Sequence, residues 1–365
     1  MPPHLLVALS PHGYGHAAMT APVVAEIRRR RPELRVTLQT SIARSWLEGR
    51  FGEDFELVPH IADFGLRQAS ATEILEEPTA EAYRTLHARL PQVVEQETAG
   101  LAAAGVDLVL SNISYVALLA ARRAGIAAVA MSCLNWADIY GHVCAARPEA
   151  PGIEAEMLEA YGAAAVFLQP APAMPMPRLG NLRPIGPIAA RGAADRLRLR
   201  RLLGVDEGTR VGLIAFGGFA AGLSFASWAR LPGWCWVVSG DPAGHPDMVD
   251  REAVAMGFTD ILSACDLVVG KPGYGTFAEA AVNGVPMLYL PRPDWPETPF
   301  LIDWLAAQGR CLPVAAVELF DEVALAMRLQ MLFSLPDKPL VEPNGIPEAA
   351  DAILAELPGR VCIRT

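Results

Sequence analysis

Short apolar runs alternate along this chain with longer segments of helical spacing, and this alternation limits the possible folds more than any other feature of the sequence. Short runs rich in Val, Leu and Ala predict buried strands, and a strand, a helix and a second strand in succession make the unit of a parallel sheet. In the first half of the chain we expect strands at residues 5–9, 35–39, 55–58, 107–110, 127–131 and 164–168, with helices such as 17–30 and 115–124 between them.

Five prolines fall between residues 170 and 184, a stretch that suits neither a helix nor a central strand and that we interpret as a linker. After it the alternation restarts, with strands expected at residues 211–216, 234–238, 267–269, 286–290 and 310–313. The sequence therefore predicts an α/β protein with two doubly wound, Rossmann-like domains facing a cleft. Their expected bounds are 1–175 and 185–344, and a C-terminal helix and tail at 345–365 could pack on either domain.

Charge and composition exclude some classes of partner. The formal net charge of −10 argues against nucleic acid, because binding a polyanion needs clustered Lys and Arg side chains. The cluster Arg28 to Arg31 is either the solvated end of a helix or a surface for anionic lipid headgroups, which leaves peripheral membrane contact open. The six cysteines show no metal or redox spacing and no secretion signal or membrane span is evident, so we expect a cytoplasmic protein.

The stretch Ser10-Pro-His-Gly-Tyr-Gly-His16 lies between the first expected strand and the first expected helix. Gly13 permits a positive φ, and the free N–H groups of the helix could hold an anion. His12 or His16 could act as a general base near neutral pH. The alternative is a tight turn in which both imidazoles only cap or pack.

Two further glycine-rich loops follow expected strands in the second half. The first, FGGFAAG at residues 216–222, places Gly217 and Gly218 after a strand but lacks the strict dinucleotide-binding order. The second, Lys271-Pro-Gly-Tyr-Gly-Thr276, combines a lysine that could neutralise phosphate with glycines that let backbone amides approach it. We expect Thr276 to cap the next helix, and Glu279 either completes a capping box or accepts hydrogen bonds from a ribose.

The loop at residues 291–300 is polar and stiffened by prolines, and its carboxylates Asp294 and Glu297 could hold sugar hydroxyls or simply cap the next helix. No metal-binding or nucleophile motif is present in the sequence, so we expect a metal-independent reaction without a cofactor.

On these segments the chain resembles the GT-B glycosyltransferases, and within them the N-terminal glycosyltransferase-like region of L-arabinokinases. It is similar, more distantly, to the N-acetylglucosaminyltransferase of peptidoglycan precursor synthesis. The resemblance covers most of the chain: HGYGH at 12–16, DLVLSNISYVA at 107–117, NWADIY at 135–140, FGGFAAG at 216–222, LPGWCWVVSG at 231–240 and the long segment 258–290. We expect no counterpart of the kinase domain of L-arabinokinases in this sequence, and the loop at residues 291–300 lacks the paired glutamines of the peptidoglycan enzyme.

The resemblance implies a transferase that uses a nucleotide sugar, with UDP-sugar as the expected donor, and an unidentified hydroxyl acceptor. It implies a catalytic His16. The implied donor-binding residues are Gly217, Gly218, Lys271, Gly273, Tyr274, Gly275, Thr276, Glu279 at the ribose and Glu297 at the donor sugar. The acceptor-side candidates are His12, Gly13, Asn112, Asn135 and Trp136. Two alternatives stay open: a binding or regulatory module without catalysis, and a sugar-nucleotide epimerase built on the same two-domain plan.

Overall fold

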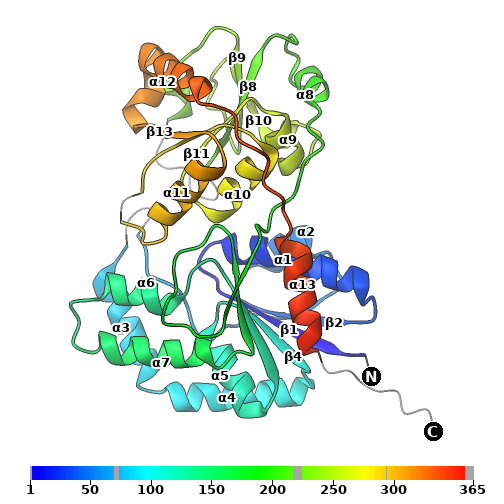
Figure 1. The fold of residues 1–365 in the computed structure, drawn as a ribbon, viewed down its shortest axis with the longest axis vertical. Helices are drawn as coiled ribbons and strands as arrows, with labels where there is room; N and C mark the ends of the chain where they lie inside the picture. Colours follow the sequence, from blue (N-terminus) through cyan, green and yellow to red (C-terminus); the bar gives the residue numbers. More distant parts are fainter. Residues whose placement is uncertain (1, 70–73, 217–223, 293, 358–365) are drawn as a thin grey trace. The chain divides into compact units, whose positions relative to one another are not determined.

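The computed structural model describes residues 2–69, 74–216, 224–292 and 294–357. The chain forms two compact units, the first made of Met1–Ile188 with Asn344–Thr365 and the second of Ala189–Pro343. Each unit is a parallel sheet with helices on both faces, which is the predicted α/β architecture (Figure 1). Of the six cysteines, five lie in the described part, and all five are buried and free of disulfide bonds.

The first unit is built on a seven-stranded sheet in the order β3-β2-β1-β4-β5-β6-β7, with every pair parallel. Its strands are β1 (His4–Leu9), β2 (Arg35–Gln39), β3 (Glu56–Val58), β4 (Leu108–Asn112), β5 (Ala127–Met131), β6 (Val166–Pro170) and β7 (Leu182–Ile185). All six residues of β1 and all five of β4 are buried, as expected for central strands covered on both faces.

The prolines between residues 170 and 184 do not mark a free linker. Pro170 ends β6, and Pro184 lies in β7, which pairs in parallel with β6 and forms the edge of the sheet. A proline is tolerated there because an edge strand leaves one row of backbone groups without a neighbouring strand. The first compact unit continues past this stretch to Ile188.

Eight helices belong to the described part of the first unit. They are α1 (Gly15–Arg30), α2 (Arg44–Phe51), α3 (Glu76–His87), α4 (Leu90–Ala104), α5 (Tyr115–Ala124), α6 (Trp136–Val143), α7 (Ala150–Gly162) and α13 (Gly345–Glu356). Helices α4, α5 and α7 lie on one face of the sheet, and α1 and α13 on the other (Figure 1). The arginines at the end of α1 pair with acidic side chains such as Glu26 and Glu33, which fits a solvated helix end.

The C-terminal helix α13 returns to the first unit and packs against α1. Two glycines allow this return, because a Cβ on Gly345 would lie 2.0 Å from the carbonyl oxygen of Gly186. The Gly186 amide also donates to Glu348 Oε2 at 2.7 Å, and Arg30 of α1 pairs with Asp351. The helix is therefore fixed to the first unit by close backbone approach and by polar contacts.

The second unit is built on a six-stranded parallel sheet in the order β10-β9-β8-β11-β12-β13. Its strands are β8 (Arg210–Ala215), β9 (Trp234–Val238), β10 (Met248–Asp250), β11 (Leu267–Gly270), β12 (Met287–Tyr289) and β13 (Cys311–Pro313). Its helices are α8 (Arg196–Leu203), α9 (Phe258–Ala264), α10 (Tyr274–Asn283), α11 (Thr298–Gln308) and α12 (Glu322–Ser334), with short 3-10 turns at Phe225–Ser227, Arg251–Ala253 and Ala316–Phe320.

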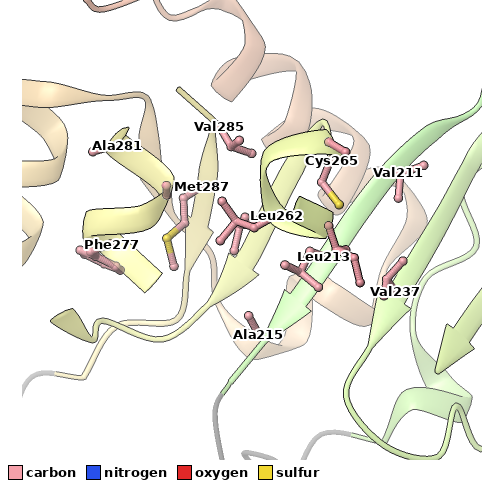
Figure 2. Packing of buried hydrophobic residues seen from close by; sticks show 14 of the residues in the cluster. Val211, Leu213, Ala215, Val237, Leu262, Cys265, Phe277, Ala281, Val285 and Met287 are labelled. Atoms are coloured by element: carbon pink, nitrogen blue, oxygen red, sulfur yellow. The ribbon is translucent and has the colours of Figure 1, made fainter. Parts of the chain in front are cut away.

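Figure 2 shows the core on one face of the second sheet, where Leu213 of β8, Leu262 of α9 and Phe277 of α10 are all fully buried. The strands β8 and β11 approach closely at their carboxyl ends, since a Cβ on Gly270 would lie 2.6 Å from the carbonyl oxygen of Ala215. This packing fixes where the loops after β8 and β11 begin.

Each sheet has one point at which the strand order reverses direction: between β1 and β4 in the first unit, and between β8 and β11 in the second. In open parallel sheets, ligands bind beyond the carboxyl ends of the strands at this point, where the flanking loops diverge. The loops singled out in the sequence follow β1, β8, β11 and β12. Both reversal points therefore carry candidate site residues.

Candidate functional site

The loop after β1 brings His16 to the reversal point of the first sheet. Gly13 has φ +72°, in the left-handed region that favours glycine, and this turn leads into α1 at Gly15. His16 lies in the first turn of the helix, with 8% of its surface exposed. Its neighbour across the reversal point is Asn112, the last residue of β4, which is fully buried.

Hydrogen bonds fix which nitrogen of His16 carries the proton. The Asn112 amide nitrogen Nδ2 donates to Thr20 Oγ1 at 2.9 Å and to the His16 carbonyl oxygen at 3.3 Å, so the other amide atom, Oδ1, must be an acceptor. Oδ1 lies 2.9 Å from His16 Nδ1, which therefore donates. The neutral imidazole then carries its lone pair on Nε2, the form required of a general base.

Burial also keeps His16 neutral. Desolvation lowers the pKa of the imidazole below its usual value, and the hydrogen bond with Asn112 opposes that shift. A histidine with a lowered pKa is uncharged at neutral pH, so it can accept a proton there.

Trp136 forms a wall beside both histidines. Its ring centroid lies 4.9 Å from that of His12, edge-on, and 5.6 Å from that of His16. The indole is buried, and its Nε1 donates to Ser10 Oγ at 3.2 Å. Space there is tight, since a Cβ on Gly65 would lie 2.5 Å from the Trp136 ring and 2.7 Å from the His12 ring.

The structure thus brings four of the predicted residues together: His12, His16, Asn112 and Trp136. His12 Nδ1 accepts from the Leu66 amide at 3.3 Å, which uses its lone pair within the fold. His16 differs from His12 in this respect. Its lone pair lies on Nε2, and among the described residues no backbone amide donates to that atom.

Asn135 has a structural task in this region. It is the N-cap of α6, where its Oδ1 accepts from the Asp138 amide at 2.8 Å and its Nδ2 donates to Asp138 Oδ2 at 2.6 Å. Both polar atoms of the side chain are engaged by Asp138, so the geometry accounts for Asn135 without a ligand.

One buried acid of this unit is absent from the sequence predictions. Asp63 lies beside the N-terminus of α5, where its Oδ2 accepts from the amides of Tyr115 at 2.7 Å and Val116 at 3.3 Å. Burial raises the pKa of this carboxyl to about 6, although those hydrogen bonds oppose the shift. A single acid in an irregular loop leaves no spacing pattern, so the sequence offered no signal for it.

The loop after β11 opens the second candidate region. Helix α10 begins at Tyr274 with Gly273 as its N-cap, so the expectation that Thr276 caps this helix is wrong. Because the helix starts earlier, Thr276 lies in its first turn, and no side-chain capping bond forms there. The predicted capping box with Glu279 is therefore absent, and the backbone amides of Tyr274, Gly275 and Thr276 lie in the first turn of α10.

Neither crowding nor a positive φ requires the glycines of this loop. Gly273 has φ −165°, an extended conformation that any residue adopts, and the nearest atom to a Cβ there lies 3.9 Å away. Gly275 has no atom within 4 Å of such a Cβ and no positive φ. Neither steric crowding nor backbone conformation requires glycine here, whereas a ligand close to the backbone would.

Glu279 lies one turn further along α10 and is partly buried. Its Oε1 lies 3.4 Å from Thr259 Oγ1, a long hydrogen bond that connects α10 to α9. The side chain of Asn283 donates to the Glu279 carbonyl oxygen at 2.9 Å. An ionised carboxylate offers about four lone-pair sites, so it can accept several hydrogen bonds from hydroxyl groups.

Two cations lie in the loops that follow the carboxyl ends of β11 and β12. Burial and the charge of Arg292 lower the pKa of Lys271 to about 8. Arg292 is half-buried in the loop after β12, with its guanidinium 4.4 Å from the centre of the Trp295 ring. Glu297, predicted to face a sugar, is 6% exposed, and its Oε2 accepts from Trp295 Nε1 at 3.2 Å. Arg292 and Trp295 are not among the residues predicted from sequence.

The remaining predictions concern two glycines, metal binding and membrane-spanning helices. Gly217 and Gly218 lie outside the described residues. Within the described ranges, no group of three or more His, Cys, Asp or Glu side chains is placed to hold a metal ion. The described helices include none with both the length and the apolar character needed to cross a membrane.

Comparison with known proteins gives one relative by sequence. No protein-family model matches the chain. It is 27% identical to an L-arabinokinase of Arabidopsis thaliana over 310 residues, which are 83% of this chain and 30% of that protein. The chain therefore spans less than a third of the curated relative that it matches.

Solved structures share the fold over nearly the whole chain. The glycotransferase of kitacinnamycin superposes with a TM-score of 0.63 at 19% identity, covering 98% of this chain and all of that one. MurG of Acinetobacter baumannii superposes with a TM-score of 0.59 at 15% identity, covering 97% of this chain and 100% of the MurG chain. A putative UDP-N-acetylglucosamine 2-epimerase of Listeria monocytogenes superposes with a TM-score of 0.54 at 14% identity, covering 98% of this chain and 96% of the epimerase chain. At these identities the likeness concerns the fold.

Proposed function

Because this chain has the GT-B fold of glycosyltransferases, we propose that it moves a sugar from a UDP-sugar to a hydroxyl group of an acceptor. The observation that carries the proposal is the pair of His16 and Asn112 at the reversal point of the first sheet. Asn112 holds the imidazole in the tautomer that leaves Nε2 as a base. A histidine that only packs in the core does not need a fixed tautomer.

In the proposed reaction, His16 Nε2 takes the proton of the acceptor hydroxyl as its oxygen attacks the anomeric carbon of the donor. A bond forms between that oxygen and the anomeric carbon, and the bond from the carbon to the diphosphate oxygen breaks. UDP leaves with the electron pair. The products are the glycosylated acceptor, UDP and a protonated imidazole that returns its proton to solvent.

The donor would be held by the second unit. Lys271 and the N-terminal amides of α10, at Tyr274 to Thr276, would bind the diphosphate and stabilise the charge that develops on it. Gly273 and Gly275 would admit the phosphates close to the backbone. Glu279 would accept hydrogen bonds from the ribose hydroxyls. We propose that no metal ion is needed, since these groups supply the positive charge.

The first test follows UDP release from a panel of UDP-sugars in the presence of mixed hydroxyl acceptors. We expect turnover by the wild type, a loss of at least a hundredfold in kcat for His16→Ala with UDP affinity retained, and a rise in Kd for UDP in Glu279→Ala. Activity in the presence of a chelator checks the metal-independent mechanism. Equal turnover by His16→Ala and wild type would remove His16 from the reaction.

A second function has one observation in its favour. His16 is only 8% exposed, and a base buried to this degree also suits a module that binds a nucleotide sugar and regulates a separate sugar kinase. Tight UDP-sugar binding with no hydrolysis and no transfer to any acceptor distinguishes this module from the transferase.

A further inference from the structure

The loop after β12 holds a chain of three side chains that ends in an arginine. Glu297, buried at the start of α11, accepts at Oε2 from Trp295 Nε1 at 3.2 Å. The buried Trp295 ring in turn lies under Arg292, with 4.4 Å from the guanidinium carbon to the ring centre. The hydrogen bond fixes the plane of the indole, and the indole face attracts the cation.

Arg292 and Lys271 lie in each other's electrostatic field. Their loops follow neighbouring parallel strands, in which Gly270 pairs with Tyr289, so both loops leave the same edge of the sheet. Burial lowers the pKa of both side chains. The charge of Arg292 lowers the pKa of Lys271 further, whereas the charge of Glu297 opposes the shift of Arg292. Two cations at one edge of the sheet attract an anion more strongly than one cation does.

The shape of an arginine decides what kind of anion fits. A guanidinium presents several N–H donors in one plane and binds the oxygens of a phosphate in pairs, while a lysine acts as a point charge. The first turn of α10 and the open space above Gly275 lie at the same edge of the sheet. This edge therefore offers two cations and backbone amides to one polyanion.

We propose that Arg292, held by Trp295 and Glu297, is a diphosphate-binding residue that acts together with Lys271. The inference rests on the proposed function and deepens it, since it names the part of the donor that this loop recognises. Glu297 is then a positioning residue: it orients Trp295, and through it Arg292, from a buried place.

The experiment measures binding of UDP, uridine and inorganic pyrophosphate by calorimetry to wild type, Arg292→Gln and Arg292→Lys. We expect Arg292→Gln to weaken the binding of UDP and of pyrophosphate at least tenfold and to leave the binding of uridine unchanged. Arg292→Lys should recover part of the lost affinity. The matched control is Arg230→Gln, which removes the same charge from an arginine that is 62% exposed and paired with Asp247.

Two variants test the positioning role. Trp295→Phe keeps an aromatic ring but loses the hydrogen bond to Glu297, and we expect a smaller loss of UDP affinity than in Arg292→Gln. Glu297→Gln keeps an acceptor for the indole N–H, so it should bind UDP better than Glu297→Ala. A merely structural role would lower the melting temperature without changing the ratio of UDP to uridine affinity.

The outcomes separate this inference from the proposed function. If UDP binds equally to Arg292→Gln and wild type while Glu279→Ala loses it, the inference fails and the donor site stands. If pyrophosphate binding depends on Arg292 but no uridine nucleotide is preferred, the anion site stands and the UDP-sugar proposal fails. If wild type binds neither UDP nor pyrophosphate, both fail.

Discussion

Lys271 gives the prediction whose magnitude follows most directly from the structure. Burial and Arg292 set its pKa at about 8, so in the free protein about nine lysines in ten are charged at pH 7 and about one in ten at pH 9. A bound diphosphate favours the charged form and raises this pKa. Binding then includes proton uptake above pH 8, and we expect UDP affinity to fall about tenfold from pH 7 to pH 9.

The assay is calorimetric titration of UDP at both pH values, in buffers of different ionisation enthalpy, so that proton uptake is measured directly. Lys271→Met is the control, because the ligand's own titration is the same for both proteins. The variant should bind UDP weakly and show a smaller change with pH. If wild type and Lys271→Met change in parallel, with no additional proton taken up by the wild type at pH 8.5, the reasoning about Lys271 is refuted.

Three further predictions concern single side chains. The pKa of Asp63 is raised in the folded state, so folding stability should fall by about 3 kcal/mol as pH rises from about 4 to 6 and then level off; Asp63→Asn should remove that slope in denaturant titrations. Gly275→Ala should keep or raise the melting temperature, because alanine favours a helix over glycine by about 1 kcal/mol. The same variant should bind UDP at least tenfold more weakly, and an unchanged affinity would place the diphosphate elsewhere. Gly345→Ala should cost about 2 kcal/mol or more of unfolding free energy from the contact with Gly186, while Gly152→Ala, with no atom within 4 Å, should not.

Much of the fold could be predicted because its buried parallel strands are short apolar runs. The expected strands at 5–9, 35–39 and 127–131 correspond to β1, β2 and β5 almost residue for residue, and the helix at 115–124 is α5. The strands β7 and β10 were missed for different reasons. β7 has two exposed residues, Arg183 and Pro184, and β10 has only three residues, so neither carries a hydrophobic signal.

The candidate site was predictable where residues are close in sequence, and less so where the fold brings them together. The motif at residues 12–16 identifies the turn into α1, but the tautomer of His16 depends on Asn112, about a hundred residues away. Thr276 was mistaken for a cap because threonine is a good capping residue, whereas the extended backbone at Gly273 starts the helix two residues before it. Arg292 gave no signal, because its significance comes from Trp295 and Lys271.

The central claim is that the second unit binds a uridine diphosphate donor, and the most direct test is calorimetric titration of UDP into wild type and Glu279→Ala, with other nucleoside diphosphates as controls. The account predicts UDP-selective binding by the wild type that is lost or strongly weakened in the variant. Absence of binding to any nucleoside diphosphate by the wild type would contradict it, and the transferase proposal would then have to be abandoned.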